Sequence, residues 1–202
     1  MIGEPSVLQV TTRLYRTASG RVPDRGAVPR GGRPRPDRVS TIAGCPTMTV
    51  FDRLVALLDH HDVAYDVLHH PPVFTSEEAA RVRGTTLASG AKALVCRADE
   101  RFVLFVLPGD RRLDGRRVRR ATGCRRLRFA TIDEVTALTG LSPGSIPPFG
   151  QLFGLATCCD AALGALPRIN FNAGDHATSL CLAYADYARV ERPAVGRFAG
   201  DP

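Results

Sequence analysis

The chain has 202 residues, of which 44% are hydrophobic, and it carries a formal net charge of +7. This length is enough for one core with or without a tail, and hardly for two independent domains. The positive charge suits a polyanionic partner such as nucleic acid. No apolar run reaches the ~18 to 20 residues of a spanning helix and residues 1–30 lack a hydrophobic signal core, so we expect no membrane partner.

The cysteines do not indicate a metal site. None belongs to a CxxC pair or has a histidine at metal-ligand spacing, and their Ala, Val, Leu and Thr neighbours predict small buried side chains in a reducing compartment. We therefore expect no metal and a cytoplasmic location. The six cysteines are Cys45, Cys96, Cys124, Cys158, Cys159 and Cys181.

Residues 1–47 differ in composition from the remainder of the chain. They contain eight Arg, three acidic residues, six Pro and six Gly, which leaves too little apolar surface to order the segment. We expect a disordered basic extension, for which three origins stay open: a stretch upstream of a true start at Met48, a basic arm that helps to hold RNA, or a transit peptide. The first is favoured because an amphipathic helix begins directly after Met48.

From Met48 the pattern is that of one folded domain, residues 48–202. Apolar residues at helical spacing behind Thr49 predict a helix over 48–63, and a strand follows over 64–70. Thr75 and Glu78 form a capping box for a short helix that ends at Gly84. Two β-rich runs, over 91–97 and 102–107, predict a hairpin.

The second half continues with a helix over 113–123, a strand over 124–130 and a helix over 131–140 with a second capping box. A loop rich in Pro and Gly, 141–150, precedes apolar runs over 151–158 and 168–174 and a strand that leads into a helix over 178–190. This irregular alternation predicts an α/β fold of the α+β type, with a mixed sheet of about six or seven strands and helices packed outside it.

Nine arginines between positions 111 and 128 form the densest charge cluster. They are either the solvated face of a helix and an edge strand or a contact surface for RNA phosphates, and their density favours the second interpretation. The RNA-binding candidates are Arg111, Arg112, Arg116, Arg117 and Arg120.

The histidines form no recognisable catalytic triad, because no Ser lies in a GxSxG elbow. His60 and His61 end a predicted helix, and His69 and His70 close a predicted strand, so we interpret all four as structural. His176 lies in a turn that contains Gly and is a candidate pocket residue.

Two further features could carry chemistry. Lys92 is the only lysine among 27 basic residues, and its compact ammonium group differs from a guanidinium in having a tunable pKa; chance survival is the alternative explanation. The loop 144–150, with two Pro and two Gly, defines a rigid backbone path that brings main-chain groups close to a ligand, or else is only a tight structural crossover.

Four stretches, HHPPVFTSEEA, GAKALV, GLSPGSIPPFG and FNAGD followed by TS, occur in this order. In this combination residues 49–190 resemble the YbaK/EbsC family of aminoacyl-tRNA editing domains, which also occur as an insertion in bacterial prolyl-tRNA synthetases. The resemblance implies a partly barrel-like mixed sheet and a trans-acting deacylase that hydrolyses the ester of mischarged tRNA, commonly tRNA-Pro carrying a small amino acid. It implies mischarged tRNA as partner, prolyl-tRNA synthetase or other translation components as further candidates, and no metal or organic cofactor.

The resemblance also implies site residues. Lys92 corresponds to the family's pocket lysine, which meets the terminal adenosine's phosphate or the developing negative charge, and residues 144–148 correspond to the GxxxP loop that positions the ester and the attacking water. Lys92, Gly144, Ser145 and Pro148 are therefore the catalytic candidates. The substrate-binding candidates are Thr75, Ile146, Phe149, Gly150, Asn172, Ala173, Gly174, His176 and Ser179.

The aminoacyl pocket departs from the family pattern. Asn172 and Ser179 stand where cysteine-removing relatives carry Ser and Asp, and NFNAG replaces the NFHP of alanine-removing relatives, so neither specificity transfers. The expected mechanism needs no protein nucleophile, because a positioned water can attack the activated ester while Lys92 and loop amides stabilise the charge on oxygen. Two alternatives stay open: a non-catalytic tRNA- or nucleotide-binding module of the same fold, and a thiol enzyme that uses Cys158 or Cys159.

Overall fold

The computed structural model describes residues 10–11 and 48–200, so the expected disorder of the basic extension lies outside the described residues. The described strands form two sheets. One contains β1 (Val10–Thr11), β2 (Tyr65–His69), β8 (Thr178–Ala183) and β7 (Arg168–Asn172), in that order and all antiparallel. The other contains β5 (Leu127–Phe129), β3 (Ala91–Ala98), β4 (Arg101–Pro108), β6 (Ala156–Asp160) and β9 (Ala194–Gly196), in that order.

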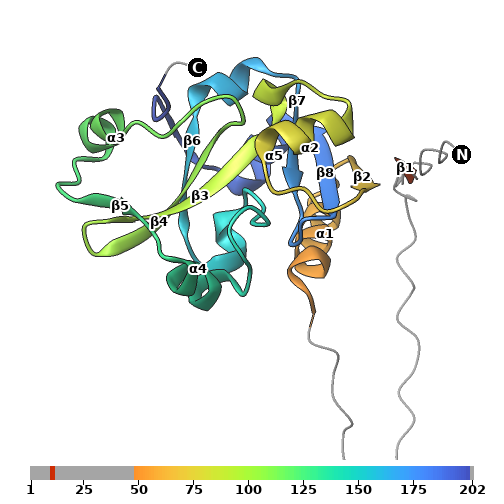
Figure 1. The fold of residues 1–202 in the computed structure, drawn as a ribbon, viewed down its shortest axis with the longest axis horizontal. Coiled ribbons are helices and arrows are strands. Elements are labelled where there is room, and N and C mark those ends of the chain that lie inside the picture. Colours follow the sequence, from red (N-terminus) through yellow and green to blue (C-terminus); the bar gives the residue numbers. More distant parts are fainter. Residues whose placement is uncertain (1–9, 12–47, 201–202) are drawn as a thin grey trace, which may run out of the picture.

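Helices cover these sheets and connect them (Figure 1). They are α1 (Val50–His60), α2 (Ser76–Arg83), α3 (Gly115–Thr122), α4 (Ile132–Thr139) and α5 (Tyr184–Glu191), with 3-10 turns η1 (Leu87–Ser89), η2 (Gly150–Phe153) and η3 (Ala161–Ala165). Thr49, Thr75 and Thr131 each cap a helix through a complete capping box, two of which the sequence predicts.

The mixed α/β fold class is confirmed, but the strands of the described segment number nine and belong to two sheets instead of one sheet of six or seven. The predicted hairpin forms as β3 and β4, and β6 lies parallel to β4 after the long connection that holds α3, β5 and α4. The short strand β9 was not predicted. It is parallel to β6 and exists because α5 returns the chain to that sheet edge.

Among the described residues, one backbone bridge, between Gly90 and Asn170, connects the two sheets. This contact joins the residue before β3 to the middle of β7. Figure 1 shows the consequence: β3 runs from the region of β7 and β8 out toward α3 and β5, which lie on the far side of the molecule from β8. The start of β3, and with it Lys92, is therefore held beside the four-stranded sheet.

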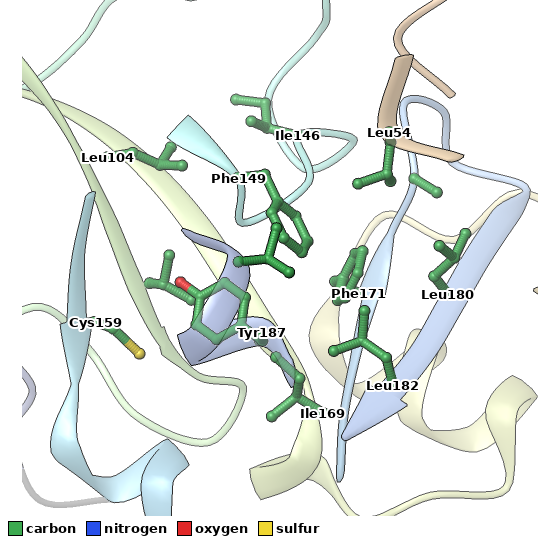
Figure 2. Packing of buried hydrophobic residues seen from close by; sticks show 14 of the residues in the cluster. Leu54, Leu104, Ile146, Phe149, Cys159, Ile169, Phe171, Leu180, Leu182 and Tyr187 are labelled. Atoms are coloured by element: carbon green, nitrogen blue, oxygen red, sulfur yellow. The ribbon is translucent and has the colours of Figure 1, made fainter. Parts of the chain in front are cut away.

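The main core lies between the sheets and takes in the loop 144–150 (Figure 2). Phe149 is fully buried, with its ring edge-to-face to Phe171 at 5.8 Å and to Tyr187 at 5.3 Å between centroids. Leu54 and Leu58, on the apolar face of α1, are also fully buried. Aromatic packing of this kind stabilises a core beyond simple area burial, and here it fixes the loop that carries Phe149.

The cysteines of the described segment are all free. Cys96, Cys158 and Cys159 are buried as expected, whereas Cys124 and Cys181 are only partly buried because they lie at the surface-facing positions of a helix end and a strand. Cys45 lies outside the described residues. Among residues 48–200, no helix has the length and apolar character to cross a membrane.

Candidate active site

A cavity of about 220 Å³ opens where α2, the start of β3, the end of β7 and the loop 144–146 come together. It exists because the bridge between the sheets holds the start of β3 against β7. Five of the residues proposed from the sequence line it together: Thr75, Lys92, Gly144, Ile146 and Asn172. The fold therefore brings Lys92 and the Pro/Gly loop, which are 52 residues apart in the chain (92 to 144), to one site.

Lys92 is half-buried in the wall of this cavity. Its ammonium nitrogen Nζ donates to the carbonyl oxygen of Gly109 at 3.1 Å. Burial lowers the pKa of Lys92 from its usual value, while the nearby carboxylates of Asp110 and Glu77 act in the opposite direction. Because an ammonium has three donors and one is used here within the described segment, two remain for a ligand.

The loop that begins at Gly144 presents main-chain donors to the same cavity. Gly144 has φ +90°, a conformation suited to glycine, and no described residue accepts a hydrogen bond from its amide or from that of Ile146. Ser145 faces away from the cavity: its amide and hydroxyl both donate to Ser142 O, at 3.2 and 2.9 Å. Ser145 thus braces the turn, and the free amides on either side of it are the groups available to an oxyanion.

The remaining loop candidates support the site from behind. Three of them, Pro148, Phe149 and Gly150, are buried and do not line the cavity. The reason is that the Phe149 ring packs in the core, which also buries the residues on either side of it. The Gly150 amide donates to Thr157 Oγ1 at 3.2 Å. These residues position the loop from outside the cavity lining.

Ala173 and Gly174, expected in the aminoacyl pocket, also lie outside its lining. Ala173 is fully buried in the main core. Gly174, with φ +103°, packs its backbone against the start of α1, where an added Cβ would lie 3.5 Å from that of Val50. β7 ends at Asn172, after which Ala173 packs into the core and Gly174 lies in the turn that leads away from the strand.

His176 stands behind the rim of the cavity. Its Nδ1 lies 3.1 Å from Val73 O and its Nε2 3.2 Å from Ser142 Oγ, and its ring contacts that of Phe74 with 4.8 Å between centroids. Since a carbonyl oxygen can only accept, Nδ1 donates to Val73 O. An added Cβ on Gly144 would lie 3.1 Å from His176 Cε1, so this ring supports the loop and the exposed Phe74 without lining the cavity.

A polar network that sequence reasoning missed forms another wall. Arg83 donates from Nε to Ser179 Oγ at 2.8 Å and from Nη2 to Asn172 Oδ1 at 2.5 Å, and Asn172 Nδ2 donates to Gly144 O at 2.8 Å. Ser179 is buried behind Arg83 and also lies 2.7 Å from His70 Nε2. The one signal for Arg83 was its place four residues after Ala79, on the inward face of α2.

The candidate RNA-binding arginines lie on and beside α3. Arg111, Arg117 and Arg120 line a second, open cleft, whereas Arg112 and Arg116 are exposed outside it. Arg117 pairs with Asp114 at 3.5 Å and donates to Ala199 O at 2.5 Å, so it has structural partners. Of the five candidates, Arg111, Arg112, Arg116 and Arg120 have no carboxylate partner among residues 48–200.

Comparison with known proteins decides the family. The family model of the aminoacyl-tRNA editing domain matches residues 70–190, which include every residue of the cavity lining. The chain belongs to this family. The resemblance to YbaK/EbsC proteins is confirmed, and with it the expected class of activity, the deacylation of mischarged aminoacyl-tRNA.

Individual relatives of this editing domain carry names that agree with this family assignment. A multifunctional Ser/Thr-tRNA deacylase, ProXp-y, of Escherichia coli K12 is 36% identical over 151 residues, which cover 72% of this chain and 90% of the relative. The prolyl-tRNA editing protein ProX of Acetoanaerobium sticklandii is 24% identical over 143 residues, 68% of this chain and 87% of the relative. A crystal structure described as a candidate trans-editing enzyme for prolyl tRNA synthetase superposes with a TM-score of 0.67 at 24% identity, covering 79% of this chain and all of that one, which shows the shared fold.

Proposed function

We propose that this editing domain works in trans, in the cytoplasm, and removes a small non-cognate amino acid from mischarged tRNA by attack of a positioned water on the ester. One observation carries the proposal. Lys92, whose ammonium group has donors left, and Gly144 and Ile146, whose amides have no acceptor among residues 48–200, line the same small cavity, which could hold an ester carbonyl. Such preorganised donors stabilise the negative charge that develops on oxygen during acyl transfer.

The size of the cavity supports a small amino acid. A volume of about 220 Å³ lies below the roughly 300 to 1,000 Å³ of pockets that enclose a whole drug-sized ligand. It suits the aminoacyl group and adjoining ribose, with the base and the rest of the tRNA outside. Because the ester is already activated, holding it next to a water supplies much of the rate without a protein nucleophile.

The rim of the cavity offers contacts to the tRNA. The side chain of Phe74 lies at the rim and the residue is 72% exposed, and an exposed aromatic face suits the terminal adenine, because base stacking is worth about 1 to 3 kcal/mol. Gly109, which holds Lys92, leads directly to Arg111 and Arg112 and on to α3. An RNA strand that leaves the cavity on this side meets unpaired cations suited to its phosphates.

The identity of the substrate follows from chemistry and from relatives. We propose tRNA-Pro or another tRNA mischarged with Ser, Thr or Ala, with prolyl-tRNA synthetase as a candidate partner. The Escherichia coli relative, named as a Ser/Thr-tRNA deacylase, supports hydroxyl-bearing amino acids, and the ProX relative supports an association with proline decoding.

A thiol mechanism is disfavoured by the position of the two candidate cysteines. Cys158 and Cys159 lie on β6 and do not line the cavity, and Cys159 is fully buried. Burial raises the pKa of Cys159 to about 11, which keeps it a thiol at neutral pH and removes its nucleophilic character.

The experiment that tests the proposal is a deacylation panel. tRNA charged with Ala, Cys, Ser, Thr or Pro is incubated with the wild-type protein and with Lys92→Ala, and the remaining ester is measured over time. We expect the wild type to hydrolyse at least one small non-cognate ester well above the spontaneous rate, and Lys92→Ala to approach that rate. Tight tRNA binding with no turnover across the panel would instead establish the non-catalytic module.

A further inference from the structure

Arg83 occupies a position in the cavity that ordinary helix chemistry does not require. It is the last residue of α2, lies one turn after the buried Ala79 on the same face, and lines the cavity together with Gly144 and Ile146. A C-terminal arginine that served only the helix dipole could remain in solvent, as the neighbouring Arg81 does. The guanidinium of Arg83 is instead partly buried against the four-stranded sheet.

Two neutral acceptors hold this guanidinium in a defined plane. Ser179 Oγ accepts a hydrogen bond from Arg83 Nε, and Asn172 Oδ1 accepts one from Arg83 Nη2. Both acceptors belong to the four-stranded sheet. His70 completes the arrangement. Its Nδ1 donates to Pro71 O at 2.8 Å, so in the neutral ring Nε2 is an acceptor. Nε2 lies 2.7 Å from Ser179 Oγ, closer than Asn172 Oδ1 at 3.3 Å, so it takes the Ser179 hydroxyl proton and the Ser179 lone pairs are left to Arg83.

The charge of Arg83 has no counter-ion within the described part of the chain. No carboxylate of residues 48–200 lies within ion-pair distance, and burial lowers the pKa of Arg83 to about 10. Its Nη1 donates to no described residue. The hydroxyl of Thr85, also in the lining, is buried without a partner. Desolvated polar groups are costly when unpaired, so this corner of the cavity is built to receive an acceptor.

We propose that Arg83 is a specificity-determining residue of the aminoacyl pocket, and that its unused N–H donors bind the side-chain hydroxyl oxygen of a seryl or threonyl group. The proposal rests on the deacylase function proposed above and assigns a residue to its substrate preference. Asn172 links this corner to Gly144 O, so the group that reads the side chain is joined to the loop that holds the ester. A substrate without the hydroxyl leaves the guanidinium unsatisfied.

Other ligands fit this corner less well. The α-ammonium of the substrate is repelled by a guanidinium, so it must face another part of the cavity. A phosphate would be attracted, but a phosphodiester continues into a long chain, whereas this small cavity is lined in part by the buried apolar residues Ala79 and Ile146. Phosphates have other cations available in Arg111 and Arg112, which follow Gly109, the hydrogen-bond partner of Lys92. A small neutral acceptor is what the corner can enclose.

The test compares substrates that differ only in the side chain. Steady-state kcat/KM is measured for Ser-, Thr- and Ala-charged versions of one tRNA with the wild type, Arg83→Met and Arg81→Met, the last a matched substitution of an exposed arginine on the same helix. We expect Arg83→Met to lower kcat/KM for the Ser and Thr esters about 10- to 100-fold, since a hydrogen bond to a charged group is worth about 1.5 to 3 kcal/mol. The Ala ester should change by less than about threefold, and Arg81→Met should leave all three unchanged.

An equal loss on all three esters, or no loss on any, would overturn the proposal. A wild type that prefers the Ala ester would also overturn the proposal for Arg83, but the proposed deacylase function would stand. A wild type that is inactive on every ester would overturn the proposed deacylase function itself. Should Arg83→Met unfold, competition by non-hydrolysable amide analogues of seryl- and alanyl-adenosine decides the matter with the wild type alone. Tighter binding of the seryl analogue by about tenfold supports the assignment, and equal binding refutes it.

Discussion

Lys92→Ala removes a cation of the cavity that has two donors left for a ligand. A unit charge about 4 Å from a developing oxyanion is worth about 4 kcal/mol at the effective dielectric near a protein surface, which is an upper bound for a half-buried ammonium. Loss of a single oxyanion donor typically costs about 10²- to 10³-fold in rate. We therefore expect kcat/KM for deacylation to fall by about 10²- to 10³-fold.

The assay follows ester loss from mischarged tRNA, corrected for spontaneous hydrolysis, and thermal unfolding is measured in parallel. Folding should change little, by about 1 kcal/mol or less, because the side chain makes one hydrogen bond, to Gly109 O. Arg101→Ala, at the exposed far end of the same hairpin, is the matched control. Lys92→Arg should also impair activity by about tenfold or more, because a planar fork replaces a compact ammonium. The reasoning is refuted if Lys92→Ala retains activity within about threefold while folded.

Gly144→Ala places a side chain at φ +90° and against His176, which costs about 1 to 3 kcal/mol, so the variant should lower both the melting temperature and kcat/KM. The control Gly123→Ala, at φ +73° with open space around it, should lower the melting temperature alone. Phe74→Ala should raise KM about tenfold with little effect on kcat and Phe74→Tyr should restore it, so an unchanged KM would exclude the stacking role. Arg120→Ala should reduce the slope of log KM against log salt by about 0.7 to 0.9, whereas Arg126→Ala, which removes an arginine already paired with Glu100 at 2.7 Å, should leave the slope unchanged.

Local features of this fold could be predicted because their causes are local. Thr75 and Glu78 lie three residues apart and form a reciprocal capping box at the N-terminus of α2, and Gly84 ends the helix in the left-handed conformation. The β3–β4 hairpin likewise follows from two adjacent β-rich runs and a short turn. Lys92 and Gly144, which lie in two of the motifs that suggested an editing domain, line one cavity.

The candidate site was predicted less well where a side chain's role depends on distant packing. Phe149, Gly150 and Ala173 lie in or next to the family motifs in sequence, but the fold buries them. Burial of aromatic and small apolar groups between the sheets stabilises the protein more than contact with a polar ligand would. Ser179 belongs to the site through Arg83 instead of through direct contact with the cavity.

By itself, the sequence determined the helices with their caps, the central hairpin, the mixed fold class and the family, since each depends on residues close in the chain or on their order. Only the tertiary structure decided that the strands divide into two sheets and that Gly90 meets Asn170. The same folding carries Arg83 to Asn172 and Ser179, 89 and 96 residues later, and so makes a helix-terminal arginine part of a pocket. No short-range pattern encodes such contacts, because they form only when two sheets close on a shared core.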